Sequence, residues 1–187
     1  MKGLLLIARR EMGAYANGYS GWLIVSLLLF VNGVFFNAFA MGKSAKASSE
    51  VLEDFFYYSF GIVCVAALLL TMRLIAEERQ TGTLVLIDSS PLADWQVVGG
   101  KYLSAMMFIA GMTAISLYMP ALIFINGKVS IGHIVAGTTG ILLVGSAVAA
   151  IGTFASTLSR SQVVAAILGG VIVVVLLLAW LLGRVTD

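Results

Sequence analysis

The hydrophobic pattern of this chain is a series of five long apolar runs separated by short polar segments. The runs cover residues 20–41, 55–75, 102–125, 134–158 and 163–182. Each has roughly the 20 residues that a helix needs to cross the hydrocarbon layer of a membrane. Their length and their lack of strict alternation favour helices over barrel strands. The pattern therefore predicts an all-α, polytopic transmembrane helical bundle that forms one domain over residues 1–187.

A shorter amphipathic helix is predicted before the first apolar run. Over residues 2–17, Leu5, Ala8, Met12 and Tyr15 recur at helical spacing on one face. The apolar stretch at residues 4–8 is short, and the charged triplet Arg9-Arg10-Glu11 follows it directly. We therefore do not expect a secretory signal peptide. We expect instead an N-terminal interfacial elbow helix that lies along the membrane surface.

Composition points to the same class of protein. Hydrophobic residues make up 60% of the chain, charged residues only 11%, and the mean hydropathy is +1.05. Soluble domains carry about 25% charged residues, so this composition indicates an integral membrane protein with little soluble mass. Its net charge of +2 does not suggest a nucleic-acid partner. The lone cysteine, Cys64, lies inside the second run, where we interpret it as a packing residue.

The distribution of basic residues predicts the orientation. Lysine and arginine in short loops are concentrated on the cytoplasmic side of membrane proteins. With five spans, one side carries the larger basic set, which is Lys2, Arg9, Arg10, Arg73, Arg79, Lys101 and Arg160. The other side carries Lys43, Lys46, Lys128 and Arg184. We therefore expect the N-terminus and the connector at residues 76–101 to face the cytoplasm.

The apolar runs contain none of the common catalytic or ion-binding patterns. No acid, base or histidine lies near the middle of a run, which argues against a proton- or sodium-driven transporter. No Ser/His pair, aspartate pair, HExxH motif or glycine-rich phosphate loop occurs in the sequence. We predict a non-catalytic subunit with no catalytic residue, no metal site and no bound cofactor. Energy for any transport would have to come from a partner.

Polar and small residues inside the runs are candidates for packing or for a pathway. Asn32 and Asn37 stand in the first run, where we expect bonds to neighbouring helices, with a pathway lining as the alternative. The fourth run contains two small-xxx-small pairs, which allow close approach of helix backbones. They are Gly145 with Ala149 and Gly152 with Ser156. We expect packing within one subunit, and a dimer contact is the alternative.

The connector at residues 76–101 is unusually long and charged for a turn between two spans. We expect the second helix to continue without a break through Arg79, and Gly82 to end it in the left-handed cap conformation. A short apolar helix then follows at residues 83–87. Pro91 would end that segment, and a new helix would begin near Asp94, whose carboxylate suits a first turn. Such an element predicts either an interfacial anchor or, as we favour, a docking site for a soluble partner.

Two blocks of sequence resemble a known family. The first is Glu77-Glu78-Arg79-Gln80-Thr81-Gly82-Thr83-Leu84, followed by Ser89-Ser90-Pro91-Leu92-Ala93-Asp94-Trp95 and Gly100-Lys101. The second runs from Gly152 to Ala165, around the turn between the fourth and fifth runs. Both resemble type-2 ABC (ABC-2) exporter permeases, and within them the gliding-motility and copper-enzyme-maturation branch of small permeases. Such permeases usually have six spans, so we expect a sixth span that is missing from these residues, and a natural five-span protein is the alternative.

The resemblance implies a transmembrane permease subunit of a multi-pass type in the cytoplasmic (inner) membrane of a bacterium. Its partners would be two ABC ATPase subunits, a second permease copy or a similar permease, the lipid bilayer, and in some systems further envelope proteins. ATP and Mg would be bound by the ATPases, and hydrolysis there would drive export of a substrate.

The resemblance also assigns residues 76–101 as the element that couples the permease to the ATPase. The residues implied are Glu77, Glu78, Arg79, Gly82, Thr83, Leu84, Leu86, Pro91, Asp94 and Trp95. Charged side chains would form polar contacts, the leucines would supply an apolar anchor, and Gly82 would permit the bend. One alternative function is a membrane scaffold or force-transmitting subunit without its own cargo pathway. A channel or a membrane enzyme is the other, and the lack of intramembrane charge and of catalytic patterns argues against it.

Overall fold

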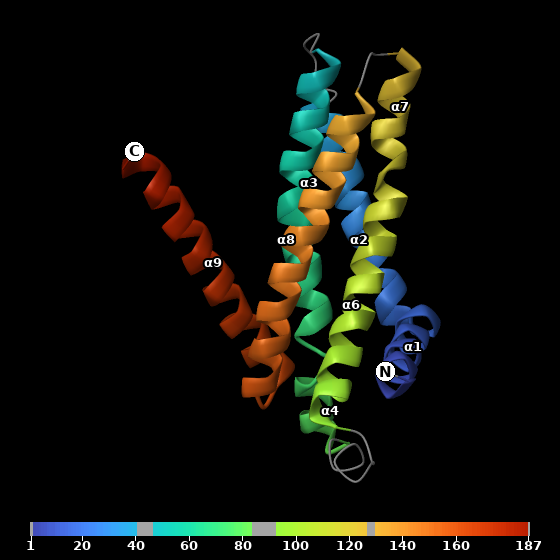
Figure 1. Cartoon of the computed structure of the whole chain (residues 1–187), viewed down its shortest axis with the longest axis vertical. Helices are drawn as coiled ribbons and strands as arrows, with labels where there is room; N and C mark the ends of the chain where they lie inside the picture. Colours follow the sequence, from blue (N-terminus) through green and yellow to red (C-terminus); the bar gives the residue numbers. More distant parts are fainter. Residues whose placement is uncertain (1, 41–46, 84–92, 127–129, 187) are drawn as a thin grey trace. The chain divides into compact units, whose positions relative to one another are not determined.

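The computed structural model describes residues 2–40, 47–83, 93–126 and 130–186. Within these ranges the chain is helical apart from short turns, and no strand occurs. The helices are α1 (Lys2–Asn17), α2 (Tyr19–Phe35), the π-helical η1 (Phe36–Ala40), α3 (Ser48–Thr71), α4 (Ala76–Thr81), α6 (Asp94–Ser116), α7 (Tyr118–Asn126), α8 (Ile131–Leu158) and α9 (Gln162–Thr186) (Figure 1). The prediction of an all-α polytopic bundle is confirmed.

Five helical stretches of the described chain are long and apolar enough to cross a membrane. They are Gly21–Phe39, Ser48–Thr81, Asp94–Ile123, Ile131–Leu158 and Gln162–Gly183. The stretch through α3 is the most buried of the five, whereas most side chains in the second half of α9 are exposed. Exposed apolar side chains on such helices are expected, because lipid covers them in the membrane.

The chain forms two compact units. The first unit contains Met1–Arg9, Ala67–Ala105 and Ala147–Asp187, and the second contains Arg10–Ala66 and Met106–Ser146. Helices α1, α3, α6 and α8 therefore contribute residues to both.

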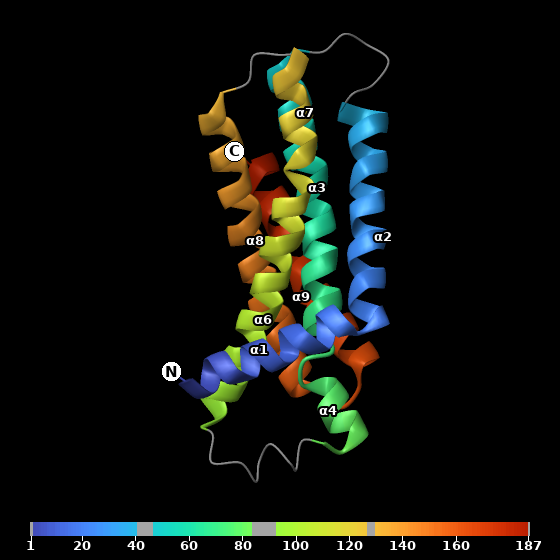
Figure 2. The ribbon, with the colours of Figure 1, turned by 90° about the vertical axis from the view of Figure 1, so that its right-hand side faces the viewer.

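The second unit has an aromatic-rich core. Its buried residues are Phe36, Val51, Leu52, Phe55, Met119 and Ile123. Figure 2 shows the end of α1 meeting α2 at a steep angle. The indole N–H of Trp22 donates a hydrogen bond to the carbonyl of Ala16 at 2.6 Å across this corner. Gly21 is needed there, because a Cβ at this position would collide with the carbonyl of Tyr15.

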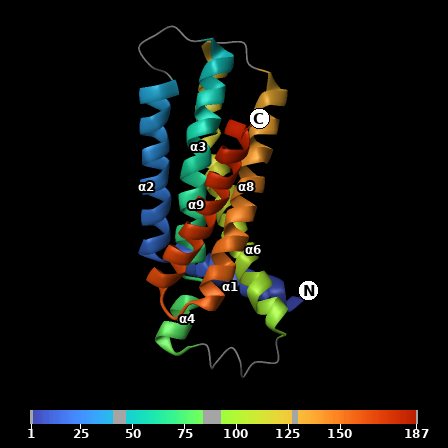
Figure 3. The ribbon, with the colours of Figure 1, turned by 90° about the vertical axis from the view of Figure 1, so that its left-hand side faces the viewer.

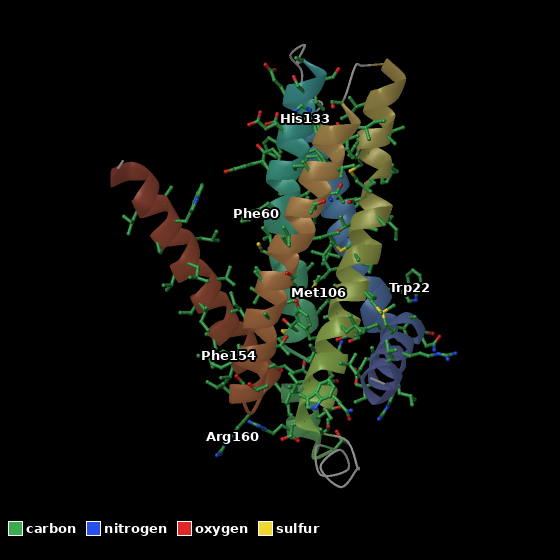
Figure 4. The ribbon with its side chains drawn as sticks, in the orientation of Figure 1. Trp22, Phe60, Met106, His133, Phe154 and Arg160 are labelled. Carbon is green, nitrogen blue, oxygen red and sulfur yellow. The ribbon has the colours of Figure 1, made fainter. Side chains whose placement is uncertain are left out.

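The first unit gathers α4 with the adjoining ends of α3, α6 and α8 and with α9. Figure 3 shows α4 beside the corner at which α8 ends and α9 begins. Glycines allow the helices to approach closely there. A Cβ on Gly169 of α9 would lie 3.0 Å from the side chain of Leu68 and 3.5 Å from Ala155. Figure 4 shows the Arg160 side chain extending away from this corner.

Two long helices that the sequence predicted as continuous are interrupted. The prediction that the second helix runs unbroken through Arg79 is wrong: α3 ends at Thr71, Met72–Ile75 form a turn, and α4 then begins. The third apolar run is also divided, with α6 ending at Ser116 and α7 beginning at Tyr118. The second interruption has a local cause, because the ring of Pro120 would clash with the carbonyl of Ser116, four residues earlier, in an unbroken helix.

Candidate functional site

The turn between α3 and α4 leaves backbone polar groups without partners in the helix, and a side chain from α8 satisfies them. The Ser156 hydroxyl accepts hydrogen bonds from the backbone N–H of Ile75 at 3.1 Å and of Ala76 at 3.0 Å. The same hydroxyl donates to the carbonyl of Met72 at 3.2 Å. A hydroxyl has one donor and two acceptor positions, so Ser156 uses all three to bridge the interruption.

The close fit of α8 against α3 brings Ser156 to this position. Gly152 lies one turn before Ser156, and a Cβ there would collide with the hydroxyl of Thr71. That hydroxyl in turn donates to the carbonyl of Ala67 at 2.6 Å, a back-bond that often bends a helix. The small-residue pair Gly152 and Ser156 thus serves both backbone approach and hydrogen bonding across the break.

An ion pair joins α4 to α6. The Lys101 Nζ lies 2.8 Å from the Glu78 Oε1, and the two side chains are 2% and 19% exposed. The second carboxylate oxygen of Glu78 is also buried, and no described residue donates a hydrogen bond to it. Gly100 beside it packs against α1, since a Cβ there would lie 2.8 Å from the carbonyl of Leu4. The pair is therefore largely removed from water. In such a buried position the attraction between opposite charges is stronger than it is at the protein surface.

Two arginines add further links around α4. The Arg79 Nη1 donates to the carbonyl of Ser159, at the end of α8, at 3.3 Å. Arg73, in the turn, forms two hydrogen bonds to the Glu77 carboxylate at 3.0 and 3.2 Å. The pair of Arg73 and Glu77 is partly exposed, so we expect it to stabilise the fold only slightly. The charged residues of α4 thus contact their own unit, at α6 through Glu78 and at the α8–α9 corner through Arg79.

The end of α4 is exposed and closely capped. Gly82 follows the helix with φ of 74°, as predicted for the left-handed cap. The Thr81 hydroxyl donates to the carbonyl of Glu77 at 2.9 Å and lies 3.0 Å from the Thr83 hydroxyl. Gln80, Thr81, Gly82 and Thr83 are all exposed. These four residues form what we call the α4 tip.

The far end of the connector is exposed as well. Helix α6 begins at Asp94, which lies in its first turn as predicted, and both Asp94 and Trp95 are exposed. Leu84, Leu86 and Pro91 lie outside the described residues, as does most of the short helix predicted at residues 83–87. Contact of any of these residues with an ATPase stays a prediction.

The two asparagines of the first span have different surroundings. Asn32 is 3% exposed, and its Oδ1 accepts a hydrogen bond from the Ser59 hydroxyl of α3 at 3.3 Å. Asn37 is exposed in η1 and lines an open groove of about 460 Å³ in the second unit. The other lining residues are Leu29, Phe30, Gly33, Val34, Ala38 and Tyr118. The structure therefore does not bring Asn32 and Asn37 together in one site.

The other predicted small-residue pair lies deep in the helix packing. A Cβ on Gly145 would lie 3.1 Å from Val63 and 3.2 Å from Ile109. Ala149 is fully buried, one turn further along α8. Among the described residues no group of three histidine, cysteine, aspartate or glutamate side chains is arranged to hold a metal ion.

Three partners in this site were not predicted as site residues. Lys101 entered the prediction only as a topology charge and as part of a motif, whereas it is buried against Glu78. The carbonyls of Met72 and Ser159 are backbone groups that a residue pattern does not reveal. One signal was present for Lys101, since opposite charges stand at the two ends of the connector.

Comparison with known protein families identifies the family of this chain. Residues 28–183 match the family model described as ABC-2 family transporter protein, a range that contains α4, Lys101, Ser156 and the α8–α9 corner. No curated protein matches the chain. The match is to the family as a whole, so the gliding-motility branch stays a prediction. Because the matched range covers most of the sequence, this chain belongs to the ABC-2 transporter family and is a multi-pass membrane permease subunit that works with ABC ATPase subunits.

Proposed function

We propose that this permease subunit couples ATP hydrolysis by its ABC ATPase partners to export of a substrate, and that residues 76–101 receive the ATPase. The observation that carries the proposal is the way α4 is held. A six-residue helix is too short to be stable alone. Here it is held by contacts to α6 and to the end of α8, while its tip is left exposed.

The contacts of α4 within its own unit leave part of its surface open to a partner. Glu77, Glu78 and Arg79 all have partners within the first unit. The exposed α4 tip, together with the exposed residues Arg79, Asp94 and Trp95, offers the described surface for an ATPase. Leu84, Leu86 and Pro91 belong to the same proposed surface by their place in the chain. The charged residues of α4 would act mainly by holding the tip in position.

The remaining parts of the proposal follow from the family and from the sequence. We propose two ATPase subunits and a pair of permease subunits per transporter, with the N-terminus on the cytoplasmic side of a bacterial inner membrane. ATP and Mg would be bound by the ATPases. Members of this family are normally non-catalytic membrane subunits, and we propose the same for this chain.

The groove that Asn37 lines is the candidate surface for cargo. Its walls are mainly apolar, with the Asn37 amide and the Tyr118 hydroxyl as polar groups. An amphiphilic substrate matches such a lining better than a highly charged one does. The force-transmitting alternative also uses ATPase docking, but it requires no flux of cargo. Substitution of Asn37 would therefore affect transport in the first case and leave the function of the second unchanged.

Site-specific cross-linking tests the docking surface. Single cysteines would replace Gln80 or Thr83, in a Cys64→Ala background, in membranes that contain the native partners. We expect both positions to cross-link to an ABC ATPase. A cysteine in place of Ser130, which is exposed in a different loop, is the matched control and should give no cross-link. If an ATPase co-purifies with the permease but neither Gln80 nor Thr83 reaches it, the docking surface lies elsewhere.

A further inference from the structure

The interruption between α3 and α4 changes how a movement of α4 can spread. In an unbroken helix, displacement of one end would pass directly along the hydrogen-bonded backbone. Here the residues Met72–Ile75 form a turn, and Ile75 has φ of −122° and ψ of −38°, outside the helical region. The backbone hydrogen bonds that cross this turn include those from Leu74 to Thr71 at 3.2 Å and from Glu77 to Arg73 at 3.3 Å. The second of these bonds is slightly longer than the usual range of about 2.7–3.2 Å, and α4 is a helix distinct from α3.

Several hydrogen bonds connect α4 to the end of α8, in addition to the backbone that connects it to α3. Three hydrogen bonds meet at the Ser156 hydroxyl, two from Ile75 and Ala76, where the turn ends and α4 begins, and one to Met72 at the start of the turn. A fourth runs from Arg79 to the carbonyl of Ser159. Ser156 and Ser159 lie at the end of α8, only a few residues before α9 begins at Gln162. The links therefore converge on the corner that starts the fifth span.

The packing around this corner leaves little room for sliding. Ser156 is fully buried, and Ser159 is 1% exposed. Gly152 contacts Thr71 of α3, and Gly169 of α9 lies against both Leu68 and Gly152. Tightly packed elements tend to move together, because a close-packed protein interior is hard to compress and transmits displacement.

We propose that Ser156 is a positioning residue that fixes α4 to the α8–α9 corner, so that a displacement of α4 is carried into the fifth span. The inference rests on the proposed docking of an ATPase at the connector for its role in transport. The joint itself exists without the partner, and can be tested without it. The fifth span would then respond to ATP at the same time as the second and third, which adjoin the connector in the chain.

The joint is tested first in the isolated protein by amide hydrogen exchange of the peptide that covers residues 72–78. In Ser156→Ala the N–H groups of Ile75 and Ala76 lose their acceptor, and we expect their exchange to speed up by about tenfold or more. Thr157→Ala is the matched control, because among the described residues the Thr157 hydroxyl bonds within its own helix, to the carbonyl of Phe154 at 2.6 Å. If Ser156→Ala does not fold, Ser156→Cys keeps the side chain's size and supplies only a weak acceptor. Unchanged exchange in the folded variant would overturn the joint.

The transmission is tested in the ATPase complex by the distance between spin labels at positions 80 and 163, which are exposed on α4 and α9. In the native sequence and in Thr157→Ala we expect one narrow distance, unchanged between the nucleotide-free and the vanadate-trapped state. Ser156→Ala should still bind the ATPase, but its distance should widen and shift on trapping. A native distance that changes with nucleotide, or a Ser156→Ala distance that stays narrow in both states, would overturn the inference. If the native chain does not bind an ATPase, the proposed function is refuted. The hydrogen-exchange result then decides by itself whether Ser156 fixes α4 to the α8–α9 corner.

Discussion

Replacement of Lys101 by methionine should strongly destabilise the chain, although a lysine at the end of a span is usually a solvated residue. The substitution keeps a long apolar stem but removes the ammonium group that lies 2.8 Å from the Glu78 Oε1. Both oxygens of the Glu78 carboxylate would then be left without a hydrogen bond from Lys101 or any other donor seen among the described residues. A charge left unpaired in this position is costly because it has already lost most of its water.

The magnitude follows from the burial of the two side chains. Removing one partner of a fully buried ion pair costs about 3–5 kcal/mol. Glu78 keeps 19% of its side-chain surface exposed, and water there offsets part of the loss. We therefore expect Lys101→Met to lower the free energy of unfolding by about 2–3 kcal/mol. Glu78→Gln keeps an acceptor for Lys101, so it should cost only about 1–2 kcal/mol.

A double-mutant cycle isolates the pair from any other contact of Lys101. The double variant Glu78→Met/Lys101→Met replaces the pair by apolar side chains, which is often close to neutral in stability. We expect it to be more stable than Lys101→Met alone, with a coupling energy of about 2 kcal/mol. The measurement is reversible unfolding in mixed micelles of the native chain, Glu78→Met, Lys101→Met and the double variant. A coupling energy below about 0.5 kcal/mol would refute the reasoning, because it is the value of a solvated surface pair.

Three further predictions test other parts of the account by the same unfolding assay. Gly152→Ala should cost about 1–3 kcal/mol because its Cβ would collide with a neighbouring helix, whereas Gly140→Ala, with no atom within 4 Å, should be neutral or slightly stabilising. Gly82→Ala should cost about 1 kcal/mol, since an L side chain is strained at its φ of 74°. Asn32→Leu should cost about 0.6 kcal/mol through loss of the hydrogen bond from Ser59, and Ser59→Ala should cost no more when added to it. Equal stability of the two glycine variants, or additive losses in the Asn32 and Ser59 pair, would contradict these interpretations.

Much of the fold could be predicted because it depends on local properties. Apolar runs of membrane length predict spans whatever their neighbours are, and the described helices lie over the predicted runs. The caps of the connector are also local. Gly82 takes the left-handed conformation that few other residues adopt, and Asp94 lies in the first turn of its helix, where a carboxylate is favourable.

The interruption at Met72–Ile75 could not be predicted because its cause is distant in the sequence. No proline or glycine marks the turn, and the hydroxyl that replaces its missing hydrogen bonds comes from Ser156, 84 residues beyond Met72. The interruption before α7 differs, since Pro120 was visible in the sequence and its effect on Ser116 is a general one.

The pairing of Glu78 with Lys101 was missed for a related reason. A lysine at the end of a span satisfies the rule for topology whether it faces water or is buried, so the sequence does not separate the two cases. The distinction requires the approach of α4 to α6, which tertiary contacts decide. The charged residues of α4 were predicted to contact a partner, which stays a prediction; the structure adds that each also has a contact within its own unit.

The most direct test of the central claim is affinity purification of this chain from its native membranes, with mass spectrometry and an ATP hydrolysis assay of the eluate. The account predicts that an ATPase with a phosphate-binding loop co-purifies with the native chain and supplies vanadate-sensitive hydrolysis. It also predicts that both are lost when the α4 tip carries Gln80→Glu and Thr83→Arg, and kept in the control Ser130→Arg. Purification of the intact chain without an ATPase, or undiminished ATPase binding by the variant with the altered α4 tip, would contradict the claim that this end of α4 receives the partner.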